Sequence, residues 1–257
     1  MKIAVISDIH ANLTALEAVL EDVEAVGAEK IYNLGDVIGY GPDPRACLAK
    51  VNNFDVNLMG NHEEAVLIGA VGFNPKAKQA IDWTRDQLNL ESEPVEINRS
   101  FWNFLGQLRR SYQDGDALFV HGSPRDPTRE YIFVHDWQDR EKMESMFAAP
   151  EGAHWNICFT GHTHYPGVFT EEESYRFYEP KAFVTMFPDG RLPYRTIINV
   201  GSVGQPRDGD HRASYVVLED GVVEFRRVEY DVRKTVARFN DCPELPDYLA
   251  RRLEEGK

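Results

Sequence analysis

The sequence predicts an α/β fold in which helices cover a sheet with parallel neighbouring strands. Two observations predict this class. In the first part of the chain, short apolar runs alternate with stretches of helical periodicity, and in the second part short apolar runs continue with few helices between them. A chain of 257 residues, of which 42% are hydrophobic and 27% charged, can bury one sizeable core. We therefore expect one domain over residues 1–257.

The first part of the chain is expected to follow the order βαβαβ. Each predicted strand is a short apolar run, and each predicted helix begins with a residue that favours a helix start: Asn12 as an N-cap and Pro44 at the first position. The expected elements are a strand over Lys2–Ile6, a helix from Asn12 to Leu20, a strand over Lys30–Leu34, a helix over Pro44–Val51 and a strand over Phe54–Met59. This order implies parallel strands covered by helices.

Residues 63–108 are expected to form a helical flap inserted after the third strand. Asn74 followed by Pro75 is a typical helix start, and the helix it opens is predicted to run to Leu88. A second helical stretch follows at Ser100–Leu105.

The remaining residues are expected to be rich in strands and to include a helix near Val232–Phe239. The polar segment Arg251–Lys257 is expected to be a frayed end. The expected strands are Ala117–Val120, Asn156–Phe159, Thr196–Val200 and a hairpin of Ser214–Leu218 with Val222–Val228 around the turn Glu219–Gly221.

Charge and composition exclude several classes of protein. A net charge of −14 repels polyanions, so we expect no long nucleic-acid partner. No window approaches the roughly 18 consecutive apolar residues of a membrane helix, so we expect no membrane span. The N-terminal segment has the pattern of a first strand and not of a signal peptide, which predicts a cytoplasmic protein. The cysteines are too widely spaced for a paired-cysteine zinc site and are expected to be reduced and buried: Cys47, Cys158 and Cys242.

Polar residues of the metal-ligand type follow five of the predicted strands. The carboxyl ends of strands in an α/β sheet line one crevice, so side chains far apart in sequence converge there. Carboxylate and amide oxygens with imidazole nitrogens, and no thiolate, favour manganese, iron, zinc or nickel over a structural cysteine-rich zinc site. The segments are Asp8-Ile9-His10, Gly35-Asp36, Gly60-Asn61-His62, His121 and Gly161-His162-Thr163-His164.

The size of this set predicts two metal ions. Two aspartates, one asparagine and four or five histidines exceed what one ion needs beside substrate and water, and two ions sharing a bridging carboxylate fit better. In an extended segment residues i and i+2 point the same way, so His162 and His164 are expected to reach into the cleft together, as are Asp8 and His10. Three glycines are expected to allow close approach of the backbone: Gly35, Gly60 and Gly161.

The chain resembles the calcineurin-like metallophosphoesterases. The five segments, with Glu63 after His62 and Gly122 after His121, match the signature motifs of that family in order and spacing, within a stretch from Lys2 to Leu218. The resemblance implies a two-sheet β-sandwich flanked by helices, with a two-metal site at the ends of the sheets. It also implies that Asp8, His10 and His164 hold one ion, that Asn61, His121 and His162 hold the other, and that Asp36 bridges them.

The resemblance further implies a catalytic role for His62, which would not bind metal. In the family, the histidine after the asparagine ligand contacts the scissile phosphate and can protonate the leaving oxygen, while a metal-bound hydroxide attacks in line. The alternative for His62 is a hydrogen bond to the neighbouring loop. We expect two divalent ions, with manganese favoured and iron, zinc, nickel or cobalt as alternatives.

A closer resemblance links the chain to the bacterial and archaeal phosphodiesterase-like branch, whose members are often assigned as dinucleoside polyphosphate hydrolases. It implies an enzyme that cleaves phosphodiester or phosphoanhydride bonds of small phosphorylated or nucleotide-like substrates. The segments that carry it are Asn74-Pro75, Trp83-Thr84-Arg85, His121–Pro127 and Gly201–Arg207.

Two alternatives remain open for the function. Protein serine/threonine phosphatases carry Gly-Asp-x-x-Asp-Arg-Gly where this chain has Gly35–Gly41 without the arginine, which disfavours a phosphomonoesterase or phosphoprotein phosphatase. A non-catalytic scaffold of the same fold is disfavoured because His62 and every ligand position are present.

Several residues outside the motifs have open roles. Arg125 and Arg207 are candidate substrate-binding residues because they lie near His121 and Gly201 in sequence, whereas the alternative for both is an ordinary surface salt bridge. The aromatic side chains of the flap, Phe73 and Trp83, can stack on a nucleobase or belong to the core, and their helical spacing favours the core.

Overall fold

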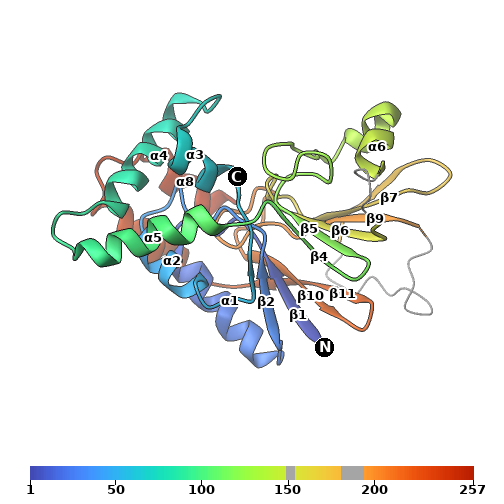
Figure 1. Cartoon of the computed structure of the whole chain (residues 1–257), viewed down its shortest axis with the longest axis horizontal. Helices are drawn as coiled ribbons and strands as arrows, with labels where there is room; N and C mark the ends of the chain where they lie inside the picture. The colour runs from blue at the N-terminus through green and yellow to red at the C-terminus, as the bar shows by residue number, and fades with distance from the viewer. Residues whose placement is uncertain (149–153, 181–193) are drawn as a thin grey trace.

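Two mixed β-sheets that pack face to face form the centre of the molecule, with helices on the outer faces (Figure 1). The computed structural model describes residues 1–148, 154–180 and 194–257. The buried side chains between the sheets include Val5 and Leu34 from one sheet and Phe119 and Phe159 from the other. The α/β class and the two-sheet sandwich that the sequence predicts are both confirmed.

The first sheet has the strand order β11-β10-β1-β2-β3. β1, β2 and β3 are parallel, as the βαβαβ order predicts. The third strand is shorter than the expected Phe54–Met59, because Leu58 instead forms a bridge to Arg109 outside the sheet. The bounds are β1 Lys2–Ile6, β2 Lys30–Asn33, β3 Val56–Asn57, β10 Ala213–Glu219 and β11 Val222–Val228.

The second sheet has the order β4-β5-β6-β9-β7-β8. Its parallel centre, β5-β6-β9, consists of the strands that the sequence predicts. The other three strands, β4, β7 and β8, were not predicted; β4 and β8 are edge strands with exposed polar residues. The bounds are β4 Ser111–Asp114, β5 Ala117–Val120, β6 Ile157–Thr160, β7 Gly167–Thr170, β8 Arg176–Tyr178 and β9 Thr196–Asn199.

Helices α1 to α5 share one core with the outer face of the first sheet. Leu16 and Leu48 on the predicted helices pack in the same cluster as Ile81, Leu88 and Leu105 from the helices of the expected flap. The flap helices are therefore part of the main core. Their bounds are α1 Leu13–Ala25, α2 Pro44–Val51, α3 Asn61–Ile68, α4 Pro75–Leu88 and α5 Val95–Gln107.

The expected helix starts are confirmed. Asn12 caps α1 by accepting a hydrogen bond from the Ala15 backbone N–H at 3.1 Å, and the Asn74 side chain caps α4 in the same way through Lys76 and Ala77. On the other side of the sandwich, α6 (Arg140–Phe147) covers the second sheet. A short 3-10 turn, Asp136–Gln138, precedes it.

The C-terminal segment is folded, so the expectation of a frayed end is wrong. α8 (Tyr248–Glu255) packs against α7 (Val232–Phe239). Leu249 and Leu253 are one helical turn apart and are 0% and 4% exposed, so they supply the apolar stripe that a docked helix needs. The polar residues between them hid this stripe in the sequence.

The strands that precede the candidate ligands point the same way. β1, β2, β5 and β6 all end beside one another at one edge of the sandwich, and α3 begins there. The cysteines are unpaired and buried, as expected. Among the described residues, no helix combines the length and the apolarity that a membrane crossing requires.

Candidate metal centre

The seven predicted ligands meet at the edge where these strands end. The loops after β1, β2, β5 and β6 and the first turn of α3 supply them, as the crevice argument predicts. Each is at most 9% exposed, which is unusual for charged and polar side chains. The set is Asp8, His10, Asp36, Asn61, His121, His162 and His164.

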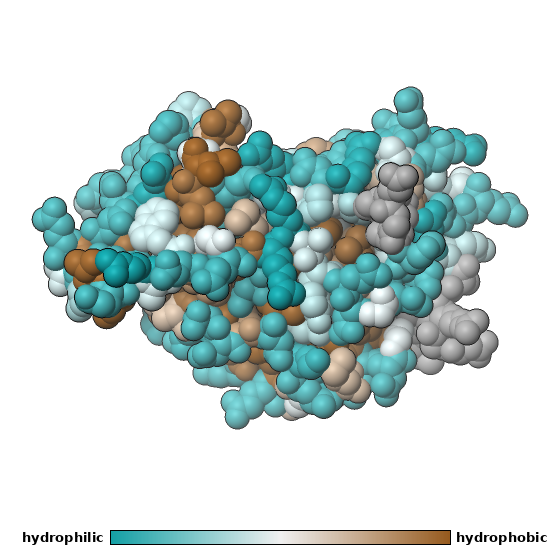
Figure 2. Space-filling model, in the orientation of Figure 1, coloured by the Kyte–Doolittle hydropathy of each residue, from teal (hydrophilic) through white to brown (hydrophobic). Residues whose placement is uncertain are grey.

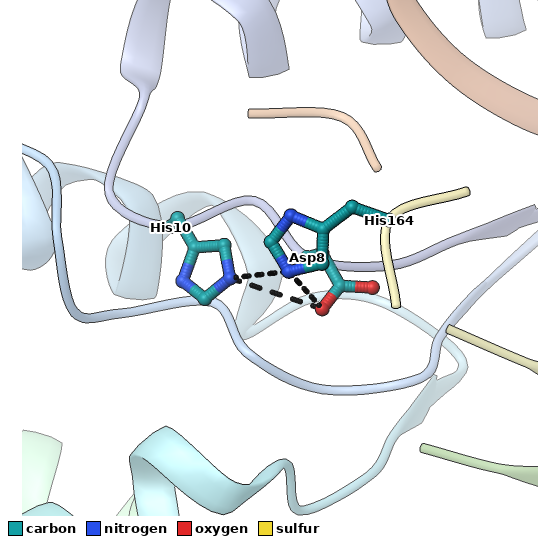
Figure 3. Close-up of side chains that lie close together, drawn as sticks. All are labelled: Asp8, His10 and His164. Carbon is teal, nitrogen blue, oxygen red and sulfur yellow. Dashed lines mark hydrogen bonds and ion pairs between the residues drawn. The ribbon is translucent and has the colours of Figure 1, made fainter. Parts of the chain in front are cut away.

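The first group of ligands consists of Asp8, His10 and His164 (Figure 3). His164 Nε2 lies 3.1 Å from His10 Nε2 and 3.2 Å from Asp8 Oδ1. Asp8 Oδ1 is buried and makes no aligned hydrogen bond. Two imidazole nitrogens and one carboxylate oxygen thus converge on one point, as the ligands of a single cation do.

The second group lies around His121. Its Nε2 atom is 3.0 Å from His162 Nδ1, 3.2 Å from Asn61 Oδ1 and 3.4 Å from Asp36 Oδ2. The structure therefore brings together the two sets of residues that the resemblance implies for two ions. His62 also lies close, since one of its ring nitrogens is within 4.8 Å of ligand atoms of His10 and Asp36.

Asp36 lies between the two groups. The same oxygen, Oδ2, is 3.6 Å from His10 Nε2 in the first group and 3.4 Å from His121 Nε2 in the second. Its other oxygen, Oδ1, accepts a hydrogen bond from the His62 backbone N–H at 2.9 Å, which fixes the rotation of the carboxylate. Asp36 is the residue placed to be shared.

Backbone carbonyls orient three of the histidines. His10 Nδ1 donates to Ile38 O at 3.2 Å, and His164 Nδ1 donates to Gln205 O at 2.6 Å. In the second group, His162 Nε2 donates to Arg129 O at 3.1 Å. Each hydrogen bond fixes one tautomer, so that the other ring nitrogen presents its lone pair to the site.

The local backbone differs from the expected extended conformation. His162 and His164 have φ of +66° and +60°, and Asp8 and His10 have φ of +55° and +47°. The paired side chains still reach the same cleft, but they do so from left-handed turns that cost non-glycine residues roughly 1–2 kcal/mol each. Long-range contacts impose these turns, for example the hydrogen bond from the His162 N–H to Asp8 Oδ2 at 2.9 Å.

Glycines make the close approach possible. A Cβ on Gly60 would collide with the Asp36 carboxylate, and a Cβ on Gly161 would collide with Asp8 Oδ2. The expectation for Gly35 is also confirmed, because a Cβ there would overlap the Gly60 backbone. Outside the predicted set, a Cβ on Gly39 would overlap the ring of His62.

The electrostatics of the site fit divalent cations. Burial lowers the pKa of His162 to about 3, so its ring is neutral and can act as a ligand. Burial alone would raise the pKa of Asp8 and Asp36, but neighbouring histidines lower both pKa values below the ordinary range, so two carboxylate charges are buried together. Burial opposes a proton on His121, yet Asp36 raises its pKa to about 9. A cation would replace that proton.

The amino-acid sequence matches the calcineurin-like phosphoesterase superfamily domain over residues 1–220. The chain belongs to the calcineurin-like phosphoesterase superfamily. A metallophosphoesterase from Sphaerobacter thermophilus has 38% sequence identity to this phosphoesterase, with 100% of both chains covered and a TM-score of 0.80.

Two further relatives cover nearly the whole phosphoesterase. An uncharacterised protein from Methanocaldococcus jannaschii is 35% identical over an alignment of 263 positions, which covers 99% of this chain and 98% of that protein. A hypothetical protein from Pyrococcus horikoshii, with 20% identity and a TM-score of 0.75, covers 100% of this chain and 98% of its own, and shares the fold.

The two candidate arginines of the phosphoesterase differ in their contacts. Arg125 is bound by Glu130, with Nε 2.7 Å from Oε2, and its side chain is 41% exposed. Arg207 lies beside the first ligand group, because its backbone N–H donates to His164 O at 3.3 Å. Its buried Nε atom has no hydrogen-bond partner among the described residues. Arg125 thus makes the ion pair of the alternative interpretation, whereas Arg207 has donor capacity to spare.

Glu63 is a further residue of the site, and we predicted no role for it from the sequence. Its buried carboxylate accepts hydrogen bonds from the backbone N–H groups of Asp36 at 2.8 Å, Gly60 at 2.9 Å and Ile38 at 3.1 Å. It therefore ties the Asp36 loop to the start of α3. The glutamate three residues after Gly60 was the available signal, since this is the spacing of a capping box.

Proposed function

We propose that this phosphoesterase uses two divalent metal ions to cleave phosphodiester or phosphoanhydride bonds of small nucleotide-like substrates. The observation that supports two ions is the position of Asp36 Oδ2, within 3.6 Å of a ligand nitrogen in each of the two groups. When bound, divalent ions supply positive charge that neutralises phosphate oxygens and activates water. Manganese suits this donor set of carboxylate, amide and imidazole, with iron, zinc, nickel or cobalt as alternatives.

In this proposal His62 donates a proton to the leaving oxygen. Its backbone is fixed by Asp36, and its ring is held between Tyr40, at a centroid distance of 4.4 Å, and Phe73, at 5.3 Å. Burial lowers the pKa of His62 to about 4, so the free site holds a neutral ring. An anionic phosphate beside the ring raises that pKa again, so the proton would arrive together with the substrate.

Arg207 is proposed to bind a phosphate oxygen of the substrate. Two observations support this: the Arg207 backbone N–H donates to His164 O, and the buried Nε atom has no hydrogen-bond partner among the described residues. Within the same proposal the substrate is a small molecule, because a chain with a net charge of −14 repels a long polyanion except where local cations reverse the field. The same proposal places the protein in the cytoplasm.

A product-resolved hydrolysis assay with added manganese tests the proposal. Diadenosine tetraphosphate, bis(p-nitrophenyl) phosphate and p-nitrophenyl phosphate are compared on the wild-type chain and on His62→Ala. We expect cleavage of the dinucleotide in preference to the monoester, with loss of turnover in the variant. Exclusive cleavage of the monoester would favour the phosphomonoesterase alternative, and no cleavage with any tested metal would favour a non-catalytic scaffold.

A further inference from the structure

A cavity of about 260 Å³ opens beside the candidate metal centre. Two of the ligands, Asn61 and His162, form part of its wall, so a group in the cavity lies next to the second ligand group. Three aromatic residues, Tyr40, Phe73 and Tyr131, line the rest together with Arg129 and the loop between α3 and α4. The volume is close to the lower end of small-molecule sites, roughly 300 Å³, and suits a single planar group with its sugar.

Tyr131 is fixed in place as one wall of this cavity. Its ring stacks on His162 at a centroid distance of 3.6 Å, and Phe133 stacks beside it at 5.3 Å with planes 3° apart. The wide centroid distance means that Phe133 covers only part of the ring, and Tyr131 is 37% exposed. Ile132, buried between the two aromatic residues, anchors the segment in the core beneath. The open part of the Tyr131 face is therefore pre-organised.

Another part of the cavity wall is also apolar. Phe73 is half-buried, with its ring edge-to-face against His62 at 5.3 Å. Val71, which also lines the cavity, is 83% exposed, and Ile68, next to the lining residue Gly69, is 69% exposed. Figure 2 shows hydrophobic surface gathered over this end of α3 and α4. An exposed apolar rim around a concave site is typical of a binding surface.

The acidic side chain in the cavity wall is already paired. This residue, Glu64, is bound by Arg110 at 2.6 Å and by Arg129. A flat uncharged ring can stack on the aromatic walls. The aromatic walls of the cavity therefore favour an aromatic group.

We infer that this cavity binds a nucleobase of the substrate, stacked on Tyr131 and Phe73, while the attached phosphate lies at the second ligand group, where Asn61 and His162 form the cavity wall. The inference rests on the proposed function for the position of the phosphate, and it adds the binding site of the base. Tyr131 and Phe73 become specificity-determining residues. A long single strand does not fit, because the cavity accommodates one base and the net charge of the chain is −14.

Calorimetric binding to the manganese-loaded chain tests the inference with two probes that differ only by the base: adenosine 5′-monophosphate and ribose 5-phosphate. Stacking of one base on aromatic side chains corresponds to at least about a fivefold gain in affinity. We expect the nucleotide to bind the wild-type chain about tenfold or more tightly than the sugar phosphate. Tyr131→Leu and Phe73→Leu should each reduce this ratio, and Tyr178→Leu, which removes an exposed tyrosine on β8, should leave it unchanged.

Equal affinities of the two probes for the wild-type chain would overturn the inference, as would a ratio that survives in both Tyr131→Leu and Phe73→Leu. A second copy of the chain on this surface would also overturn it. In that case the nucleotide would not bind, and Tyr131→Leu would lower the molecular mass in solution. If dinucleotide hydrolysis is absent but the affinity ratio holds, the proposed function fails and the inference stands. If the dinucleotide is hydrolysed but the two probes bind with equal affinity, the inference fails and the proposed function stands.

Discussion

His10 Nε2 and His164 Nε2 face each other at 3.1 Å, although 154 positions separate the two residues in the chain. Neither nitrogen donates a proton to the other, because the Nδ1 atoms of both rings carry the protons that bind backbone carbonyls. Burial lowers the pKa of both histidines, so both rings are neutral. Two lone pairs at this distance repel each other unless a cation binds between them. This contact is the clearest sign in the fold of a metal ligand pair.

The shared position of Asp36 predicts a loss of metal in Asp36→Asn. The substitution keeps the shape of the side chain and removes the negative charge that both groups of ligands face. We expect the metal content after dialysis, measured by elemental analysis, to fall by about one ion per chain or more, together with turnover. Asp86→Asn, on the exposed face of α4, is the matched control and should keep its metal. A fully loaded Asp36→Asn chain would contradict the bridging role.

The contact between Gly39 and His62 predicts that Gly39→Ala impairs catalysis without loss of metal. The new Cβ would overlap the His62 ring and displace it. Turnover should fall toward that of His62→Ala, for which removal of a general acid predicts a loss of about 10²- to 10⁴-fold. Gly27→Ala is a matched control, because Gly27 also has a left-handed φ, +71° against +84°, but no atom lies within 4 Å of its Cβ position.

Both alanine variants should therefore lose stability from backbone strain, on the order of 1–2 kcal/mol, with a further loss in Gly39→Ala from the displaced His62 ring, while only Gly39→Ala loses turnover. Thermal unfolding and steady-state kinetics separate the two effects. Full turnover in Gly39→Ala would show that the position of the His62 ring does not matter for the reaction.

The unused donor of Arg207 predicts an effect on substrate binding. A charge-assisted hydrogen bond to phosphate contributes about 1.5–3 kcal/mol, so Arg207→Gln should raise KM for the dinucleotide about tenfold or more. Metal content should be unchanged. Arg125→Gln is the comparison, because its guanidinium is already bound by Glu130. Steady-state kinetics of both variants decide between the arginines, and a larger effect at Arg125 would reverse the assignment.

Local signals in the sequence explain which parts of the fold could be predicted. The bounds of β1, α2 and β5 match because each is an apolar run or a proline-started helix with polar residues on both sides. The candidate ligands could be proposed for the same reason, since each segment that carries them follows such a run. In contrast, β4 has a polar sequence, and its pairing with β5 is decided by the partner strand.

Tertiary contacts explain the parts that could not be predicted. The left-handed turn at His162 is held by a hydrogen bond to Asp8, which lies far away in sequence. The local sequence around His162 and His164 does not reveal this contact and favoured an extended segment. Tyr131 has no motif around it, and its position against His162 follows from the fold of the loop after β5. Glu63 was visible in the sequence, but its three backbone partners were not.

Away from the metal centre, Asp22 joins α1 to the hairpin of β10 and β11. Its carboxylate accepts hydrogen bonds from Arg226 Nε at 2.7 Å and Nη2 at 2.9 Å, and from the Tyr215 hydroxyl at 2.6 Å. The Arg226 hydrogen bonds lower the pKa of Asp22 below its ordinary value of 3.8, although partial burial opposes this. The folded state therefore holds the ionised carboxylate more tightly than the unfolded chain does.

A carboxyl group with a lowered pKa stabilises the fold above its unfolded pKa, and the contribution is lost as the pH falls through the folded value. Asp22→Asn should therefore lower the free energy of unfolding by about 1–3 kcal/mol at pH 7 and by the same amount at pH 5. Below pH 4 the difference from wild type should shrink. Urea unfolding with chelator in every sample measures it without a contribution from metal release, and Glu24→Gln, exposed on the same helix, should differ from wild type by less than about 0.5 kcal/mol. A difference that already shrinks between pH 7 and pH 5, or that persists unchanged at pH 3, would show that the ionised form of Asp22 is not what stabilises this contact.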